Sequence, residues 1–232
     1  MKQTPRKIGI RNDLDHLPPP YCYRYEFDIQ LQPSFSVRFS VEYYDRDDIS
    51  VEEIEAEGFS ENDDFEWEGS LPEIWEKRVE NIVKELKKGD KKGNLKITID
   101  KEGYFSSDLE NFDSFVQELI QAVYESCGKQ NKLTLELIKL PENKKLNYEI
   151  SFLQLEASIN DQKIDWIKSH KLLEDIFSMD FDPFNALTKE PTKKGIYLNT
   201  GDSLWYKVDS SVKSTNGKSV YNYFDNLFKE FL

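Results

Sequence analysis

Residues 21–44 read YCYRYEFDIQLQPSFSVRFSVEYY, and in this stretch apolar and polar residues alternate. The odd positions are apolar, and the even positions up to residue 42 are polar except Cys22. A period of two is typical of β-strands that bury one face. Pro33 has no N–H for a central ladder, so the pattern predicts a hairpin of strands 22–31 and 35–44.

The odd-numbered side chains are the candidate core of this hairpin. A slip of one residue would bury charged side chains in their place, so the register is strongly specified. We therefore expect Phe27, Ile29, Val37 and Phe39 to be buried.

Two periods of apolar residues, 2 for strands and 3.6 for helices, assign most of the remaining chain to strands and helices. Further strands are expected at 95–100, 133–140, 146–159, 196–199 and 203–209, with a bulge or bend near 152–153 where the apolar residues change parity. Helices are expected at 70–89, 107–128, 165–179 and 220–231, the first two with capping boxes at Ser70 and Glu73 and at Ser107 and Glu110.

A strand pair followed by a helix thus recurs three times, at 22–88, 133–178 and 196–231. Short connections between strands favour antiparallel pairing. The sequence therefore predicts an α+β fold of antiparallel β-hairpins with helices packed on one face.

The domain organisation has two readings. Three consecutive prolines end residues 1–20, which we interpret as an extended arm lying over the surface. The rest, 21–232, is either a single α+β domain or two modules, 21–128 and 133–232.

The cysteine count and hydropathy restrict the compartment. The chain of 232 residues contains only Cys22 and Cys127, in unlike contexts, which argues against a disulfide scaffold and favours a reducing compartment. No apolar run resembles a signal peptide or a membrane span. We expect a cytoplasmic protein that does not bind membranes.

The net charge of −13 is concentrated in one segment. Residues 42–80 contain 16 Asp and Glu but only three basic residues, whereas acids and bases are equal in number elsewhere. Such a local field attracts a basic protein partner and repels nucleic-acid phosphate. We therefore expect no direct binding to nucleic acid.

The centre of this segment, ENDDFEWEGS at 61–70, combines carboxylates with two aromatic rings. Aromatic rings flanked by charge are typical of binding hot spots, and this predicts a docking surface. Its residues are Glu61, Asp63, Asp64, Phe65, Glu66, Trp67 and Glu68.

Two other interpretations of 61–70 stay open. The rings, with Phe59, could pin a solvated connection to the core. The alternate acids before Gly69 also resemble the first half of an EF-hand loop, although its twelfth position is Trp75 and not Glu.

Signs of catalysis are weak, and we expect no catalytic residue, no metal site and no cofactor. The chain has no phosphate-binding glycine loop and no hydrolase or zinc motif. The alternative to a binding protein is a metal-dependent nuclease or hydrolase that uses strand carboxylates and a lysine. Its candidates are Asp100, Glu136, Glu149 and Lys163.

A second aromatic and acidic stretch, SMDFDPFNAL at 178–187, is explained mostly as a turn. If it has a function, the exposed ring is Phe181 or Phe184. The preferred hypothesis is therefore a non-enzymatic acidic interaction protein, with the oligomeric state open. An inhibitor or immunity-type protein that covers a nucleic-acid-binding site fits this charge layout.

Overall fold

The structure is a computed structural model that describes residues 6–89, 93–215, 217 and 219–232. The chain divides into two compact units, Met1–Lys129 (unit 1) and Gln130–Leu232 (unit 2). Each unit contains antiparallel sheets and helices, which confirms the α+β class.

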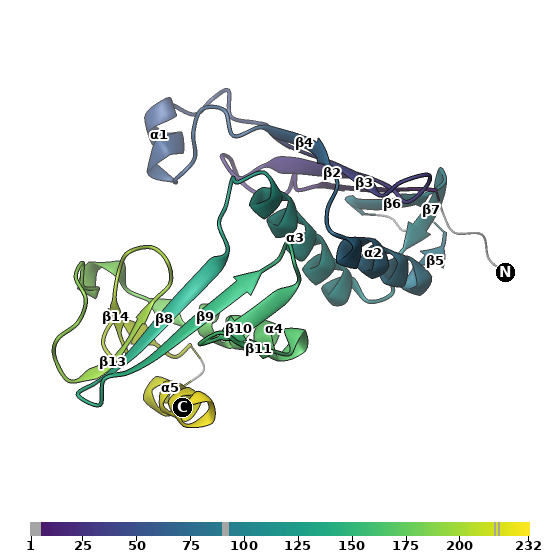
Figure 1. Ribbon diagram of the computed structural model, residues 1–232. Helices are drawn as coiled ribbons and strands as arrows, with labels where there is room; N and C mark the ends of the chain where they lie inside the picture. The colour runs from purple at the N-terminus through teal and green to yellow at the C-terminus, as the bar shows by residue number, and fades with distance from the viewer. Residues whose placement is uncertain (1–5, 90–92, 216, 218) are drawn as a thin grey trace. The chain divides into compact units, whose positions relative to one another are not determined.

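Unit 1 is built on a seven-stranded sheet with the order β4-β3-β2-β1-β6-β7-β5. The helices α2 and α3 lie on the same side of this sheet (Figure 1). The strands are β1 (Lys7–Asp13), β2 (Tyr23–Gln30), β3 (Ser36–Tyr43), β4 (Phe65–Gly69), β5 (Lys87–Lys88), β6 (Leu95–Ile99) and β7 (Glu102–Phe105). The helices are α1 (Val51–Ala56), α2 (Glu73–Glu85) and α3 (Leu109–Ser126).

The hairpin of β2 and β3 has the predicted register. Phe27 lies opposite Phe39, and their rings stack with centroids 4.5 Å apart. Phe27, Ile29, Val37 and Phe39 are at most 1% exposed, so the predicted core face is confirmed. The helix side of the sheet is this apolar face.

The interpretation of residues 1–20 as a surface arm was wrong for residues 7–13. These residues form β1, which pairs with both β2 and β6 in the middle of the sheet. Ile8 and Ile10 are buried on the helix side. Two isoleucines flanking Gly9 provide the same alternation as the hairpin, but over a stretch too short to stand out.

Neither predicted capping box forms. The Ser70 hydroxyl donates to the Phe35 carbonyl at 3.0 Å, and α2 begins after Pro72. Asp108 caps α3 by accepting from the Asn111 N–H. The capping box that does form, Ser50 with Glu53, begins α1, a helix that the pattern did not predict.

Unit 2 is built on a six-stranded sheet with the order β11-β10-β9-β8-β13-β14 and has a separate pair, β12 and β15. The strands are β8 (Leu133–Leu140), β9 (Lys144–Ser151), β10 (Glu156–Ile159), β11 (Gln162–Ile164), β12 (Asp180–Phe181), β13 (Gly195–Asn199), β14 (Tyr206–Lys207) and β15 (Val212–Lys213). The helices are α4 (Trp166–Phe177), the 3-10 turn η1 (Pro183–Asn185) and α5 (Val220–Phe231).

The single strand predicted over 146–159 is two strands. β9 ends at Ser151, the chain reverses, and β10 pairs back with Glu156 opposite Ser151. The parity of the apolar residues changes because the chain turns over, and not because a bulge interrupts one strand.

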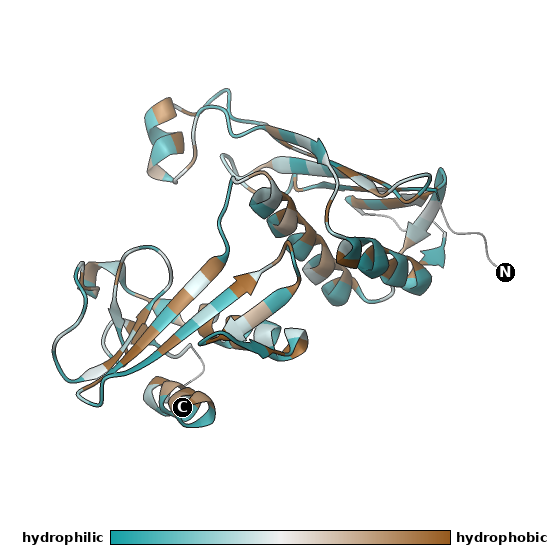
Figure 2. Cartoon of the chain, viewed as in Figure 1, coloured by the Kyte–Doolittle hydropathy of each residue, from teal (hydrophilic) through white to brown (hydrophobic). Residues whose placement is uncertain are grey.

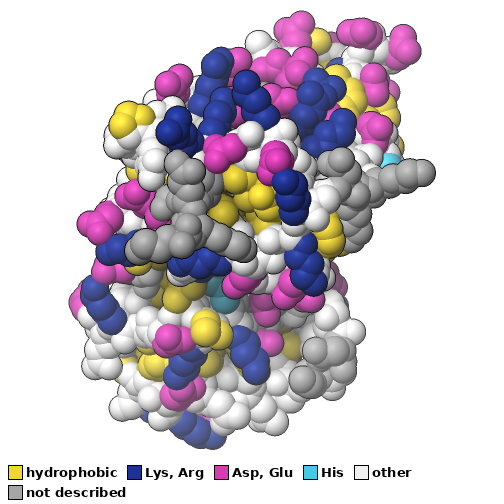
Figure 3. Space-filling model, turned by 90° about the vertical axis from the view of Figure 1, so that its right-hand side faces the viewer, with side chains coloured by type: hydrophobic (Ala, Val, Ile, Leu, Met, Phe, Trp, Pro, Cys, Tyr) yellow, Lys and Arg dark blue, Asp and Glu magenta, His cyan; other side chains and the backbone are white. Residues whose placement is uncertain are grey.

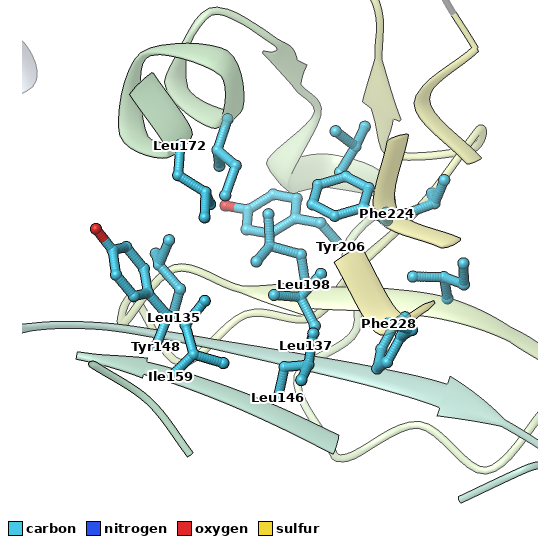
Figure 4. Close-up of a cluster of buried hydrophobic side chains, with 14 of the residues drawn as sticks. Leu135, Leu137, Leu146, Tyr148, Ile159, Leu172, Leu198, Tyr206, Phe224 and Phe228 are labelled. Carbon is cyan, nitrogen blue, oxygen red and sulfur yellow. The ribbon is translucent and has the colours of Figure 1, made fainter. Parts of the chain in front are cut away.

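The larger core cluster of unit 2 lies on one face of its sheet, and a smaller buried cluster of Ile138, Tyr197 and Trp205 lies on the other. Hydrophobic and hydrophilic residues alternate along β8 and β9 (Figure 2), and the hydrophobic ones pack against α4 and α5. Figure 4 shows Phe224 and Phe228 of α5 beside Leu137 and Leu198 of the sheet. The C-terminal helix is therefore part of the fold, as predicted.

None of the helices in residues 6–89, 93–215 and 219–232 combines the length and the apolar character needed to cross a bilayer.

We expect Phe228→Ala to lower the free energy of unfolding by about 3–5 kcal/mol, since it leaves a cavity in the core. Phe228 is 1% exposed, whereas Tyr221 on the same helix is 40% exposed. Tyr221→Ala is the matched control and should change stability by about 0.5 kcal/mol or less. Urea denaturation measures both, and equal losses would mean that α5 does not pack on the sheet.

Candidate functional site

The second half of ENDDFEWEGS is a strand and not a loop. β4 pairs with β3 at one end of the seven-stranded sheet, with Trp67 opposite Phe39. Trp75, which would take the last ligand position of an EF-hand, is fully buried in α2. The calcium-loop interpretation is therefore wrong.

Side chains along β4 alternate between the two sides of the sheet. Phe65 and Trp67 are half-buried, whereas Glu66 and Glu68 are exposed. A Cβ on Gly69 would lie 2.6 Å from Cζ2 of Trp67, so the indole extends along its own strand over a position that requires glycine. Gly69 thus leaves room for the indole to lie along its own strand.

Phe65 is held by α3 and the residues that follow it. Its ring lies 5.4 Å from that of Tyr124 in an edge-on arrangement. The Lys129 ammonium lies 4.3 Å from the Phe65 ring centroid, within the range of a cation–π interaction. This cluster fixes the start of β4.

Arg46 anchors the segment that precedes β4. Its guanidinium lies 4.3 Å from the Tyr43 ring centroid and 4.9 Å from that of Phe59. It donates to the carbonyls of Pro20 and Ser60 and, at 3.0 Å, to the Asp63 carboxylate. The Arg46 side chain is only 9% exposed, so this ion pair is largely shielded from water.

The Asp63 carboxylate is bound from two sides. Its partial burial alone would raise its pKa, but hydrogen bonds from Ser60 and Arg46 and the Arg46 charge together lower the pKa below the ordinary value. A lowered pKa means that the contribution of Asp63 to stability is fully present above its unfolded pKa of about 3.9 and is lost as pH falls through the folded pKa.

The predicted docking residues therefore divide into two groups. Glu61, Glu66 and Glu68 are exposed, and within the described residues their side chains make no hydrogen bond that holds the segment in place. Glu66 has a solvated ion pair with Arg38 at 3.6 Å. Asp63 and Asp64 are structural, since Asp64 accepts the Tyr43 N–H at 2.8 Å. The rings of Phe65 and Trp67 support the strand from the helix side.

The helix α1, which the sequence pattern did not predict, presents further exposed acids of the same acidic segment. Its exposed carboxylates, with the residue that follows the helix, are Glu52, Glu53, Glu55 and Glu57. Tyr21 donates to Glu57 and packs edge-on against Phe59 at 5.6 Å. The spacing of Ser50 and Glu53 is the capping-box signal that could have predicted this helix.

Sequence reasoning also missed Arg46. It is a single cation in a long acidic run, close to Tyr43 and Tyr44 in sequence. A lone arginine in such a run, next to aromatic residues, indicates an internal ion pair, because a charge is buried only with a partner.

Glu66 and Glu68 belong to the side of the sheet opposite to α2 and α3. A shallow hollow of about 580 Å³ lies over this side and is lined by charged side chains of several strands, including Arg11, Arg24, Arg38 and Glu66. Figure 3 shows Lys and Arg interspersed with Asp and Glu on one face of the molecule. The acidic strand thus borders a surface of mixed charge.

The candidates for the hydrolase alternative have other contacts. Asp100, in unit 1, accepts the backbone N–H groups of Arg6 and Lys7 at 3.0 Å. In unit 2, Glu149 and Lys163 both lie opposite Ser158, and Lys163 pairs with Glu156. Glu136 lies opposite Asn147.

Within the described ranges, no group of three or more His, Cys, Asp or Glu is placed to hold a metal ion. The metal-dependent hydrolase therefore stays a prediction, and the described residues provide no candidate metal site for it.

The second aromatic and acidic stretch separates its two rings. Phe181 packs edge-on against Tyr206 at 5.1 Å, whereas Phe184 is 99% exposed at the 3-10 turn η1. Asp182 accepts the N–H groups of Phe184 and Asn185, which stabilises the turn that presents the exposed Phe184 ring.

Comparison with known proteins finds no matching family model, no matching curated protein and no matching solved structure. We therefore infer the function from the geometry of the chain itself.

We expect Arg46→Met to release the segment before β4, since it leaves Asp63 without its cation. A loss of about 1.5 kcal/mol in local stability would speed cleavage at Glu61 by a glutamyl endopeptidase roughly tenfold. Arg38→Met is the matched control, because the Arg38 ion pair is solvated and such pairs contribute little. Equal cleavage of both variants would show that Arg46 is not the anchor.

Proposed function

We propose that the protein is a non-enzymatic, cytoplasmic binding protein whose acidic edge docks on a basic surface of another protein. The docking edge consists of β4 with Glu61 before it. The observation that carries the proposal is that Glu66 and Glu68 project from an ordered strand whose other side is fixed by half-buried rings.

Preorganisation distinguishes this edge from a solvated acidic loop. Ordering a flexible loop on binding costs conformational free energy, whereas a strand that pairs with β3 and is anchored at its start presents its charges already in position. The exposed acids of α1, which lie in the same segment, extend the negative field. Mutual repulsion among these carboxylates would be relieved by a basic partner.

The partner class follows from charge. A basic surface that binds nucleic acid is the kind of surface that an acidic protein can cover, so we infer an inhibitor or immunity-type role. The free thiols of Cys22 and Cys127 agree with the reducing compartment of this proposal.

We expect reversal of Glu61, Glu66 and Glu68 to Lys to slow association with the partner by about tenfold or more at low ionic strength, because steering contributes 10- to 1,000-fold to on-rates. Asp63 and Asp64 are left unchanged because they hold the segment in place. The partner is first captured from the native host on immobilised protein, and its association rate is then measured by surface plasmon resonance.

The matched control reverses Glu110, Glu174 and Glu190, which are exposed acids outside the acidic segment. It changes the net charge by the same amount. If the partner associates equally slowly with both triple variants, net charge and not the docking edge governs binding, and the proposal fails.

A further inference from the structure

The outer edge of β4 exposes backbone groups as well as acidic side chains. β4 is the terminal strand of its sheet. The Tyr44 N–H donates to the Cys22 carbonyl at 3.2 Å, so the even-numbered residues of β3 direct their backbone groups toward β2. The odd-numbered residues of β3 therefore face β4.

This alternation determines which backbone groups of β4 are free. Phe65, Trp67 and Gly69 lie opposite odd-numbered residues of β3 and use their N–H and C=O groups in that pairing. The N–H and C=O groups of Glu66 and Glu68 must then point away from the sheet. In the described part of the chain, neither residue makes a backbone hydrogen bond outside the ladders.

We propose that this edge binds an extended segment of the basic partner as an additional β-strand. The inference rests on the proposed function and specifies its binding mode. Strand addition to an exposed sheet edge obtains affinity from main-chain hydrogen bonds and specificity from alternate side chains.

The register of the added strand predicts its sequence pattern. The residues opposite Glu66 and Glu68 lie on the open side of the sheet, with Cα atoms about 5.5 Å from their partners, so Lys or Arg there pairs with each carboxylate. The residue between them faces the helix side next to the half-buried ring of Trp67, so an apolar side chain fits there. The segment therefore alternates basic and apolar residues.

The same charges select against a second copy of this chain. Two β4 edges brought together would place glutamates beside glutamates, and like charges directly opposite each other are destabilising. The acidic edge thus disfavours self-association and favours a basic strand.

The test uses the peptide acetyl-Lys-Val-Lys-Val-Lys-Val-Lys-amide at low ionic strength, with binding measured by fluorescence anisotropy. In the proposed register, the lysine N–H groups bond to β4 and the valine N–H groups point outward. Methylation of the backbone nitrogens of the two inner lysines should weaken binding roughly tenfold, because two main-chain hydrogen bonds of about 0.7 kcal/mol each are lost. N-methylation of two valines, with equal charge and composition, should change binding little.

A pair of protein variants tests the reciprocal hydrogen bond, from the Glu66 N–H to a carbonyl of the peptide. Glu66→Pro removes the outward N–H without touching the pairing with β3, and edge strands tolerate proline. Glu66→Ala removes only the carboxylate. We expect the proline variant to bind the peptide about threefold more weakly than the alanine variant, with unchanged circular dichroism.

The outcomes separate the two proposals. If both methylated peptides bind equally well, strand addition is overturned while charge-driven docking stands. If the unmodified peptide does not bind at all at low ionic strength, both proposals fail. If the protein alone forms a dimer that Glu66→Pro dissociates, the occupant of the edge is a second copy and the inference is wrong.

Discussion

The pairing of β4 with β3 in a single register is the constraint on which the candidate site depends. Because Trp67 lies opposite Phe39, the rings of β4 face the helices and its glutamates face water. A slip of one residue would turn Glu66 and Glu68 toward the core side, and burying unpaired carboxylates costs several kcal/mol. One choice of register therefore sets the positions of the rings, the charges and the free backbone groups together.

Two anchors hold this register. Arg46 binds the segment before the strand through Asp63 and two aromatic rings. Phe65 is fixed at the start of the strand by Tyr124 and Lys129. Buried or shielded contacts inside the acidic segment thus allow its remaining carboxylates to stay exposed on an ordered scaffold. The repulsion among those carboxylates is opposed by local structure and by the solvated ion pair of Glu66 with Arg38.

Periodicity predicted the elements whose patterns are long, and missed those whose signals are short or non-local. The hairpin of β2 and β3 shows a period of two over more than twenty residues, and its core was predicted correctly. β1 offered only Ile8 and Ile10. β4 itself contains an alternation, since Phe65 and Trp67 flank Glu66, but the density of charge around it favoured a loop interpretation.

The site was predictable only in outline, because its key contacts join distant parts of the chain. Arg46 gathers the Pro20 carbonyl, the Ser60 carbonyl and the Asp63 carboxylate, and no local pattern specifies such a set. Ser70 shows the same effect, since its hydroxyl is used by Phe35 and not by a helix cap. Sequence reasoning thus located the acidic segment and its rings, whereas the division into structural and free carboxylates required the fold.

Amide hydrogen exchange along residues 65–69, measured residue by residue on the protein alone, tests directly whether β4 is an ordered strand with an open edge. An ordered strand with an open edge should show an alternation. The amides of Phe65, Trp67 and Gly69 are then protected by β3, and those of Glu66 and Glu68 exchange at nearly unprotected rates. Protection of all five amides would mean that the edge is already covered. Absence of protection throughout would mean that β4 is not an ordered strand, and either result would contradict a preorganised, open docking edge.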